Sequence, residues 1–174
     1  MPYTPFHFGP GLTIKGVASP VFSWFAFVAA QVLIDCETLY YLLHHTYPIH
    51  RFFHSFLGAS LAGLVAAVLW FLFVTVAGQV WPAGVNKQTQ PRIVRTELSL
   101  PSILVGGLVG GITHTFLDSI MHPDLRPFMP FSNYNPFLGL VGDGTLYDAC
   151  VVAGIVGLIL VLRSLRAQRD VPVR

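Results

Sequence analysis

The sequence places metal-binding side chains inside segments that are otherwise apolar. An ionisable residue within a membrane span usually faces the interior of the helix bundle and marks a functional site. Histidine and carboxylate ligands together are typical of Zn²⁺ sites, and of Mn²⁺ or Fe²⁺ sites when carboxylates bridge. We therefore predict a centre of one or two divalent metals, with Zn²⁺ preferred over Mn²⁺ and Fe²⁺. The residues concerned are Asp35, Glu37, His50, His54, His114 and Asp118.

The spacing of these residues supports a shared site. His50 and His54 are four residues apart, as are His114 and Asp118, so each pair is expected to lie on one face of a helix. With a rise of about 1.5 Å per residue, the three segments place their polar side chains at a similar depth. The alternative is that each His is a hydrogen-bond partner between helices, which is the commoner role of a single membrane His.

The composition identifies the kind of protein that must position this site. Of 174 residues only 10% are charged and 53% are hydrophobic, whereas soluble domains carry about 25% charged residues. With a mean hydropathy of +0.64, the chain cannot be a soluble globular domain, a disordered chain or a coiled coil. A net charge of +2 and the lack of a basic stripe also argue against nucleic acid as a partner.

The apolar runs predict an all-α fold, an integral membrane four-helix bundle with the His/Asp metal site near the outer leaflet. About 20 apolar residues span a bilayer as a helix. The expected spans are about 20–43, 48–80, 101–121 and 145–165, within one membrane-embedded domain of residues 1–174. The glycine pairs Gly106–Gly107 and Gly110–Gly111 are expected to let the third span pack closely on its neighbours.

Basic residues predict the orientation. Four spans put both termini and the middle loop on one side, and an excess of Lys and Arg marks the cytoplasmic side. We therefore expect a multi-pass protein of the plasma (inner) membrane with both termini cytoplasmic. The residues on that side are Lys15, Lys87, Arg92, Arg95, Arg163, Arg166, Arg169 and Arg174, against only Arg51 and Arg126 on the other.

Four residues close to the expected centre are candidates for binding substrate. Arg51 lies between the two histidines of the second span, and His122, Asp124 and Arg126 begin the long loop at 122–144. This loop is rich in Pro and aromatic residues and is expected to cover the site as a lid, although an interfacial anchor explains the same composition.

Several of these segments resemble a bacterial family of membrane-bound, metal-dependent hydrolases whose best-known member is an SOS-regulated inner-membrane protein. The matching segments are Pro5-Phe6-His7-Phe8-Gly9-Pro10-Gly11, Leu33-Ile34-Asp35, His50-Arg51-Phe52-Phe53-His54-Ser55 and His114-Thr115-Phe116-Leu117-Asp118.

The resemblance implies a helical core with a metal centre similar to that of zinc-dependent phospholipases C. It implies metal ligands at His7, Asp35, His50, His54, His114 and Asp118. The charge count, by contrast, puts His7 on the cytoplasmic side, unless the N-terminal segment folds back into the membrane.

These observations favour a metal-dependent hydrolase of phosphoester bonds in a membrane lipid or lipid-linked substrate. Bound metals lower the pKa of water and stabilise charge on phosphoryl oxygens. Asp35 and Glu37 are the candidate catalytic residues, Glu37 as a general base or as an acceptor for a metal-binding His. One alternative is a transporter or channel for divalent metal or protons. Another is a structural membrane protein whose helices are held together by bound metal. The sequence does not specify an oligomeric state.

Overall fold

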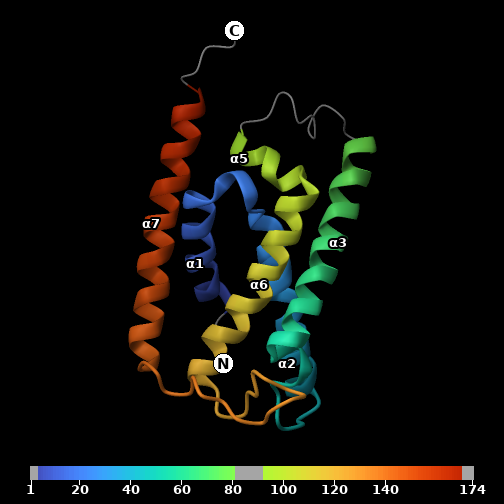
Figure 1. Cartoon of the computed structure of the whole chain (residues 1–174), viewed down its shortest axis with the longest axis vertical. Helices are drawn as coiled ribbons and strands as arrows, with labels where there is room; N and C mark the ends of the chain where they lie inside the picture. The colour runs from blue at the N-terminus through green and yellow to red at the C-terminus, as the bar shows by residue number, and fades with distance from the viewer. Residues whose placement is uncertain (1–3, 81–91, 170–174) are drawn as a thin grey trace.

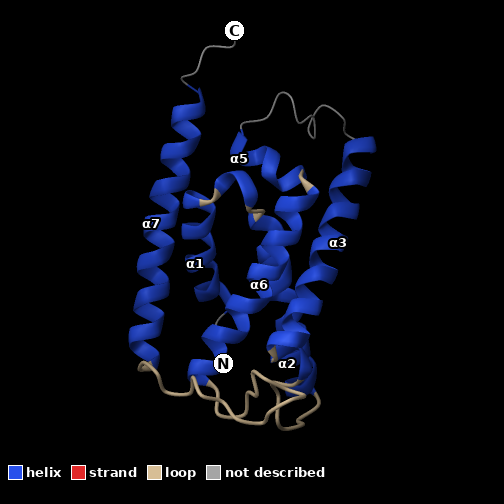
Figure 2. Ribbon diagram, in the orientation of Figure 1, coloured by secondary structure: helices blue, strands red, loops and turns tan. Residues whose placement is uncertain are grey.

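The structure is a computed structural model that describes residues 4–80 and 92–169. Every regular element in these ranges is a helix, as Figures 1 and 2 show. Lys87 and Arg174, which entered the charge count, lie outside the described residues. The elements are α1 (Thr4–Val17), η1 (Ser19–Val21), α2 (Trp24–Leu43), η2 (Phe52–His54), α3 (Phe56–Val80), α5 (Arg92–Arg95), η3 (Thr96–Leu98), α6 (Leu100–Met121) and α7 (Asp143–Arg169).

Four helices, α2, α3, α6 and α7, are long and apolar enough to cross a membrane, which confirms the all-α membrane fold. Their outward faces carry large apolar side chains, such as Leu69 and Phe73 on α3 and Val152 and Ile155 on α7, each more than half exposed. A soluble monomer rarely exposes contiguous apolar surface on this scale, so these faces are suited to lipid.

The centre of the bundle is α6, which packs on α2 and α3 through its glycines. A Cβ added at Gly106 or Gly110 would overlap backbone oxygens of α2 or of its N-terminal cap, and one at Gly107 or Gly111 would overlap carbonyls of α3. The prediction that the two glycine pairs allow close helix packing is confirmed, because each pair contacts both neighbouring helices.

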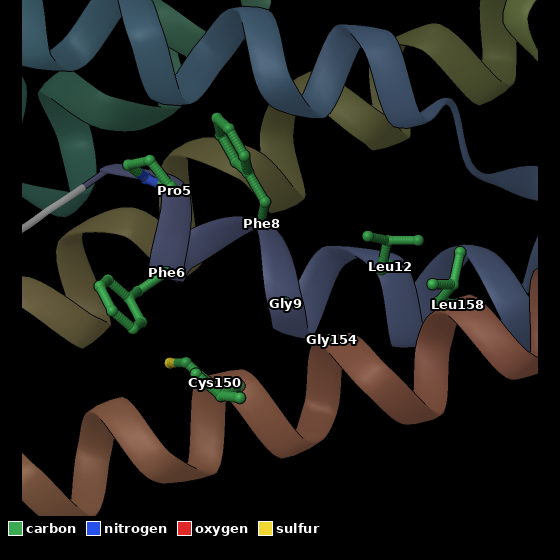
Figure 3. Close-up of a pocket in the computed structure, with 9 residues that line it drawn as sticks. Pro5, Phe6, Phe8, Gly9, Leu12, Cys150, Gly154 and Leu158 are labelled. Atoms are coloured by element: carbon green, nitrogen blue, oxygen red, sulfur yellow. The ribbon is translucent and has the colours of Figure 1, made fainter.

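The N-terminal helix α1 is an element that the span count did not include. It has 14 residues and lies between α7 and the rest of the bundle (Figure 1). It runs parallel to α7, with Gly9 against Cys150 and Gly154, and Gly16 against Gly157 and Leu160. Figure 3 shows the close approach of Gly9 and Gly154 beside a small apolar cavity of about 290 Å³.

The position of α1 bears on the prediction that both ends of the chain lie on the same side of the membrane. The first described residue, Thr4, lies toward the end of the bundle where α7 begins, and α7 ends at the opposite end (Figure 1). The prediction that both termini lie on one side assumed four crossings and no further helix. The added helix α1 brings the first described residues to the end where α7 begins, while α2 still starts near the other end of α7, with Trp24 close to Val161 and Leu165.

The second predicted span is shorter than expected. The structure begins α3 at Phe56, where the Ser55 hydroxyl accepts a hydrogen bond from Gly58 N at 3.0 Å, which is a typical N-terminal cap. Residues 44–55 therefore form a loop that contains η2, and the prediction that His50 and His54 share one helical face is wrong.

A buried ion pair closes the end of the bundle opposite this loop. Lys15 Nζ lies 2.6 Å from Glu97 Oε1, and both side chains are almost completely buried. Glu97 Oε2 also accepts hydrogen bonds from the Ser23 hydroxyl and from Phe25 N, at the start of α2. This network ties α1, α2 and η3 together.

Candidate metal centre

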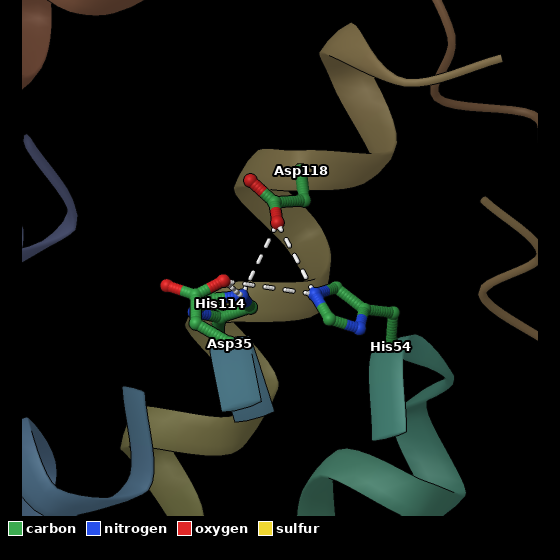
Figure 4. A group of neighbouring side chains, drawn as sticks. All are labelled: Asp35, His54, His114 and Asp118. Atoms are coloured by element: carbon green, nitrogen blue, oxygen red, sulfur yellow. Dashed lines mark ion pairs between the residues drawn. The ribbon is translucent and has the colours of Figure 1, made fainter. Parts of the chain in front are cut away.

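Four side chains from three parts of the chain converge at the end of the bundle where the loops 44–55 and 122–142 lie. Figure 4 shows Asp35 of α2, His54 of η2, and His114 and Asp118 of α6. His114 Nε2 lies 3.2 Å from Asp118 Oδ2 and 3.4 Å from Asp35 Oδ1. His54 Nε2 lies 3.7 Å and 3.9 Å from the same two oxygens. One ligand atom from each residue falls within 4.8 Å of the others, so together they could hold one metal ion.

Two histidines of this group, and the neighbouring His50, each have an oxygen acceptor within hydrogen-bond distance of Nδ1. His114 Nδ1 lies 2.5 Å from Gln31 Oε1, His54 Nδ1 lies 3.2 Å from Glu37 Oε2, and His50 Nδ1 lies 2.9 Å from Asp124 Oδ1. Donation from Nδ1 leaves Nε2 as the lone-pair nitrogen. Histidines that bind metals almost always donate their other ring N–H to an oxygen in this way.

A second group shares one residue with the first. His50, His122 and Asp118 also bring one ligand atom each within 4.8 Å of one another. The His50 and His122 rings stack with centroids 4.3 Å apart. Asp118 therefore belongs to both groups and could contribute a ligand atom to a metal ion in either one.

The environment of the second group favours neutral imidazoles. Burial lowers the pKa of His50 below its ordinary value, and the neighbouring His54 acts in the same direction. Burial lowers the pKa of His122 to about 4. Neutral imidazole is the form that binds a metal, so both rings are in the right state at neutral pH. Asp124, whose carboxylate is held by His50, has a lowered pKa although burial opposes this.

His7 of α1 reaches the same place. Its Nε2 lies 3.2 Å from Asp118 Oδ1, and its ring meets that of His114 edge to face at 4.7 Å between centroids. The N-terminal segment does fold back into the bundle. His7 lies outside both ligand groups, so it contacts the centre through Asp118.

Buried polar atoms without hydrogen bonds provide a test of whether a metal fits. Buried polar atoms nearly always have a hydrogen-bond partner, and exceptions require an explanation. Among the described residues, several atoms of this cluster have none. They are His50 Nε2, His114 Nε2, His122 Nε2 and both carboxylate oxygens of Asp118. These are the atoms that a bound divalent cation would satisfy.

The predicted catalytic and substrate-binding residues lie beside the centre in different roles. Glu37 Oε2 accepts hydrogen bonds from the backbone N–H groups of Arg51 and Phe53 as well as facing His54, so Glu37 shapes the loop. Asp124 likewise accepts from Ile49 N and His50 N. His122 joins the second ligand group, although the sequence analysis assigned it to substrate.

The two arginines line a cavity of about 570 Å³ next to His50. Glu37, Tyr41, Asp124 and Met129 are also part of its wall. The guanidinium of Arg51 stacks on the Tyr41 ring, with its central carbon 3.7 Å from the ring centroid, and its Nε donates to the carbonyl of Pro48. Arg126 is exposed. The cavity therefore combines two arginines and two carboxylates, those of Glu37 and Asp124, with direct access to the candidate ligand His50.

Two partners of the centre were missed by the sequence analysis. Gln31 holds His114, and the Thr38 hydroxyl lies 3.1 Å from His54 Nε2. Gln31 lies four residues before Asp35 in an apolar helix, the same spacing that drew attention to His114 and Asp118. That spacing could have identified Gln31.

The fold and the site define a class: an all-helical membrane protein with four long apolar helices and a buried His/Asp cluster at one end. A family model described as YdjM inner membrane protein matches residues 10–169, and the chain belongs to this family. No curated protein and no solved structure matches the chain. The family description confirms the inner membrane and does not extend to hydrolysis or metal binding.

Proposed function

We propose that the protein is a metal-dependent hydrolase of a phosphoester bond in a membrane lipid or lipid-linked molecule. The observation that carries this proposal is Asp118, which belongs to two ligand groups next to a cavity with two arginines. Paired metal ions about 3.5–4 Å apart recur in enzymes that cleave phosphoester bonds.

Zn²⁺ is the metal we propose, with Mn²⁺ and Fe²⁺ as alternatives. The first group, Asp35, His54, His114 and Asp118, offers two nitrogens and two oxygens, a donor set that Zn²⁺ accepts readily. The second group offers His50 and His122 with the shared Asp118, which leaves coordination positions for water or substrate.

Divalent metals bound here would supply an activated water and would stabilise charge on phosphoryl oxygens. In this proposal Arg51 and Arg126 hold the substrate phosphate, because guanidinium groups match phosphate geometry. Glu37 is a positioning residue for His54, and Asp35 is the most accessible carboxylate of the first group, with a side chain 21% exposed. We therefore assign proton transfer to Asp35 rather than to Glu37.

Transport is less well supported than hydrolysis. Between Ser23 and Gln31, the inward face of α2 consists of Ala26, Phe27 and Ala30, all fully buried. This apolar layer separates the polar groups at the two ends of the bundle, whereas a relay for ions or protons requires polar groups along its path.

The test is hydrolysis by purified protein in vesicles that contain a phospholipid, with Zn²⁺, Mn²⁺ or Fe²⁺ supplied separately. We expect release of the phosphorylated headgroup by the wild type and a loss of about 10³-fold or more in His114→Ala, on the scale of losing a catalytic metal ion. His44→Ala, at the exposed end of α2, is the matched control and should keep activity. Equal rates in the wild type and His114→Ala would reject the proposal.

A further inference from the structure

A groove between α2 and α3 faces outward along the membrane-exposed surface. It has a volume of about 500 Å³, and all ten residues of its lining are apolar. Ala29 and Ala66 are its small residues, which leave the space that larger side chains would fill. At one end Phe25 and Trp70 stack, with ring centroids 5.0 Å apart. Cys36, between Asp35 and Glu37, lies at the other end.

The groove adjoins the charged cavity along α2, where Cys36 of the groove is followed by Glu37 of the cavity. Phe25, Ala29 and Leu33 line the groove at every fourth position, and the next two positions in this series, Glu37 and Tyr41, line the cavity that contains Arg51 and Arg126. Residues four apart are neighbours one turn apart on a helix surface, so Leu33 of the groove lies next to Glu37 of the cavity. The groove therefore leads along α2 to a cavity beside the candidate metal centre, lined by Arg51 and Arg126 and by the carboxylates of Glu37 and Asp124.

The length of the groove fits one lipid chain. From Phe25 to Cys36 the helix rises about 16 Å at 1.5 Å per residue. The hydrocarbon core of a bilayer is about 30 Å thick, so the groove spans about one leaflet. An acyl chain of a phospholipid extends over this depth when its headgroup lies at the level of the cavity.

We propose that the substrate is a phospholipid whose phosphate lies between Arg51 and Arg126 and whose acyl chain lies in the α2–α3 groove. The stack of Phe25 on Trp70 closes the groove and limits the chain length that it accommodates. This inference rests on the proposed function for the reaction itself, but the binding site stands on the groove and the cavity alone.

The experiment uses the full-length protein in vesicles that contain phosphatidylglycerol with a photoreactive diazirine at mid-chain. We expect cross-links on peptides of residues 25–36 and 62–73, beyond the level on the exposed face of α7. Ala29→Phe should reduce these cross-links about tenfold, because it displaces about two methylene groups' worth of apolar contact. Ala149→Phe, which is exposed at the start of α7, is the matched control and should change nothing.

A second part of the experiment tests the proposed binding of the lipid headgroup. The double variant Arg51→Gln/Arg126→Gln should reduce cross-linking in the groove while leaving the α7 cross-links unchanged, since only a bound phosphate couples the two sites. Cross-linking that is equal in the groove and on α7 would overturn the inference. So would cross-linking that is unchanged both in Ala29→Phe and in Arg51→Gln/Arg126→Gln.

Separate readouts distinguish this inference from the proposed function. Hydrolysis of a short-chain, water-soluble phosphatidylglycerol is measured on the same preparations. If the short-chain lipid is cleaved and the groove is not labelled, the proposed function stands and the acyl-chain site is wrong. If the groove is labelled as expected and no lipid is cleaved, the lipid site stands and the hydrolase proposal is wrong.

Discussion

His7 Nε2 lies 3.2 Å from Asp118 Oδ1, which connects α1 to the central helix α6 at the level of the candidate metal centre. Both side chains are almost completely buried. Asp118 thus has one oxygen facing His7 and the other facing His114 and His54. The helix that the span count missed is therefore part of the site.

We predict that His7→Ala weakens metal binding about 10- to 100-fold, the usual loss when a residue that orients a metal ligand is removed. Competition with a chelator of known affinity measures this. His45→Ala, in the exposed turn after α2, is the matched control and should leave affinity unchanged. An unaltered affinity in His7→Ala would show that the contact with Asp118 is only a packing contact.

Glu37→Gln is predicted to weaken metal binding about 10- to 100-fold as well, because a neutral amide accepts more weakly from His54 Nδ1 and from two loop N–H groups. Glu97→Gln disturbs a comparably buried carboxylate at the other end of the bundle. It should reduce stability without changing metal affinity per folded molecule. If both variants lose metal equally, the effect of Glu37 is a general loss of folding.

Lys15→Met is predicted to destabilise the fold by about 3–5 kcal/mol, because it leaves the Glu97 carboxylate buried without its cation. The double variant Lys15→Met/Glu97→Gln should recover much of this loss. Unfolding in mixed micelles of increasing denaturing detergent measures the difference. A double variant that is no more stable than Lys15→Met would contradict this explanation.

Gly107→Ala is predicted to destabilise by about 1–3 kcal/mol, because its Cβ would overlap the carbonyl oxygen of Gly63 where α3 meets α6. Gly142→Ala lies in the exposed loop before α7, with no atom near the added carbon, and serves as the control. The same unfolding measurement applies. Equal stability of the two variants would mean that the helices separate to accept a methyl group at little cost.

The sequence predicted the four long helices because apolar runs of about 20 residues have few alternatives to spanning a bilayer. It failed for α1, whose 14 residues include Pro10 and are too few to span. A short helix at membrane depth is tolerated where protein surrounds it, as α7 and the rest of the bundle surround α1. Periodicity alone carries no information about such shielding.

The site was predictable in residue type and only partly in geometry. His114 and Asp118 lie one turn apart on α6, as their spacing indicated. His50 and His54 have the same spacing but lie in a loop, where the carboxylates of Glu37 and Asp124 bind backbone N–H groups that a helix would otherwise use. Contacts of this kind come from residues distant in the sequence, so local spacing could not reveal them.

The central claim is a divalent metal centre that depends on Asp118. The most direct test is elemental analysis of detergent-purified protein after incubation with Zn²⁺, Mn²⁺ or Fe²⁺. It compares the wild type with Asp118→Asn and with Asp148→Asn, an exposed carboxylate on α7 outside both ligand groups. We predict near-stoichiometric metal in the wild type and in Asp148→Asn, and its loss in a folded Asp118→Asn. Folded wild-type protein that retains no metal would contradict the account.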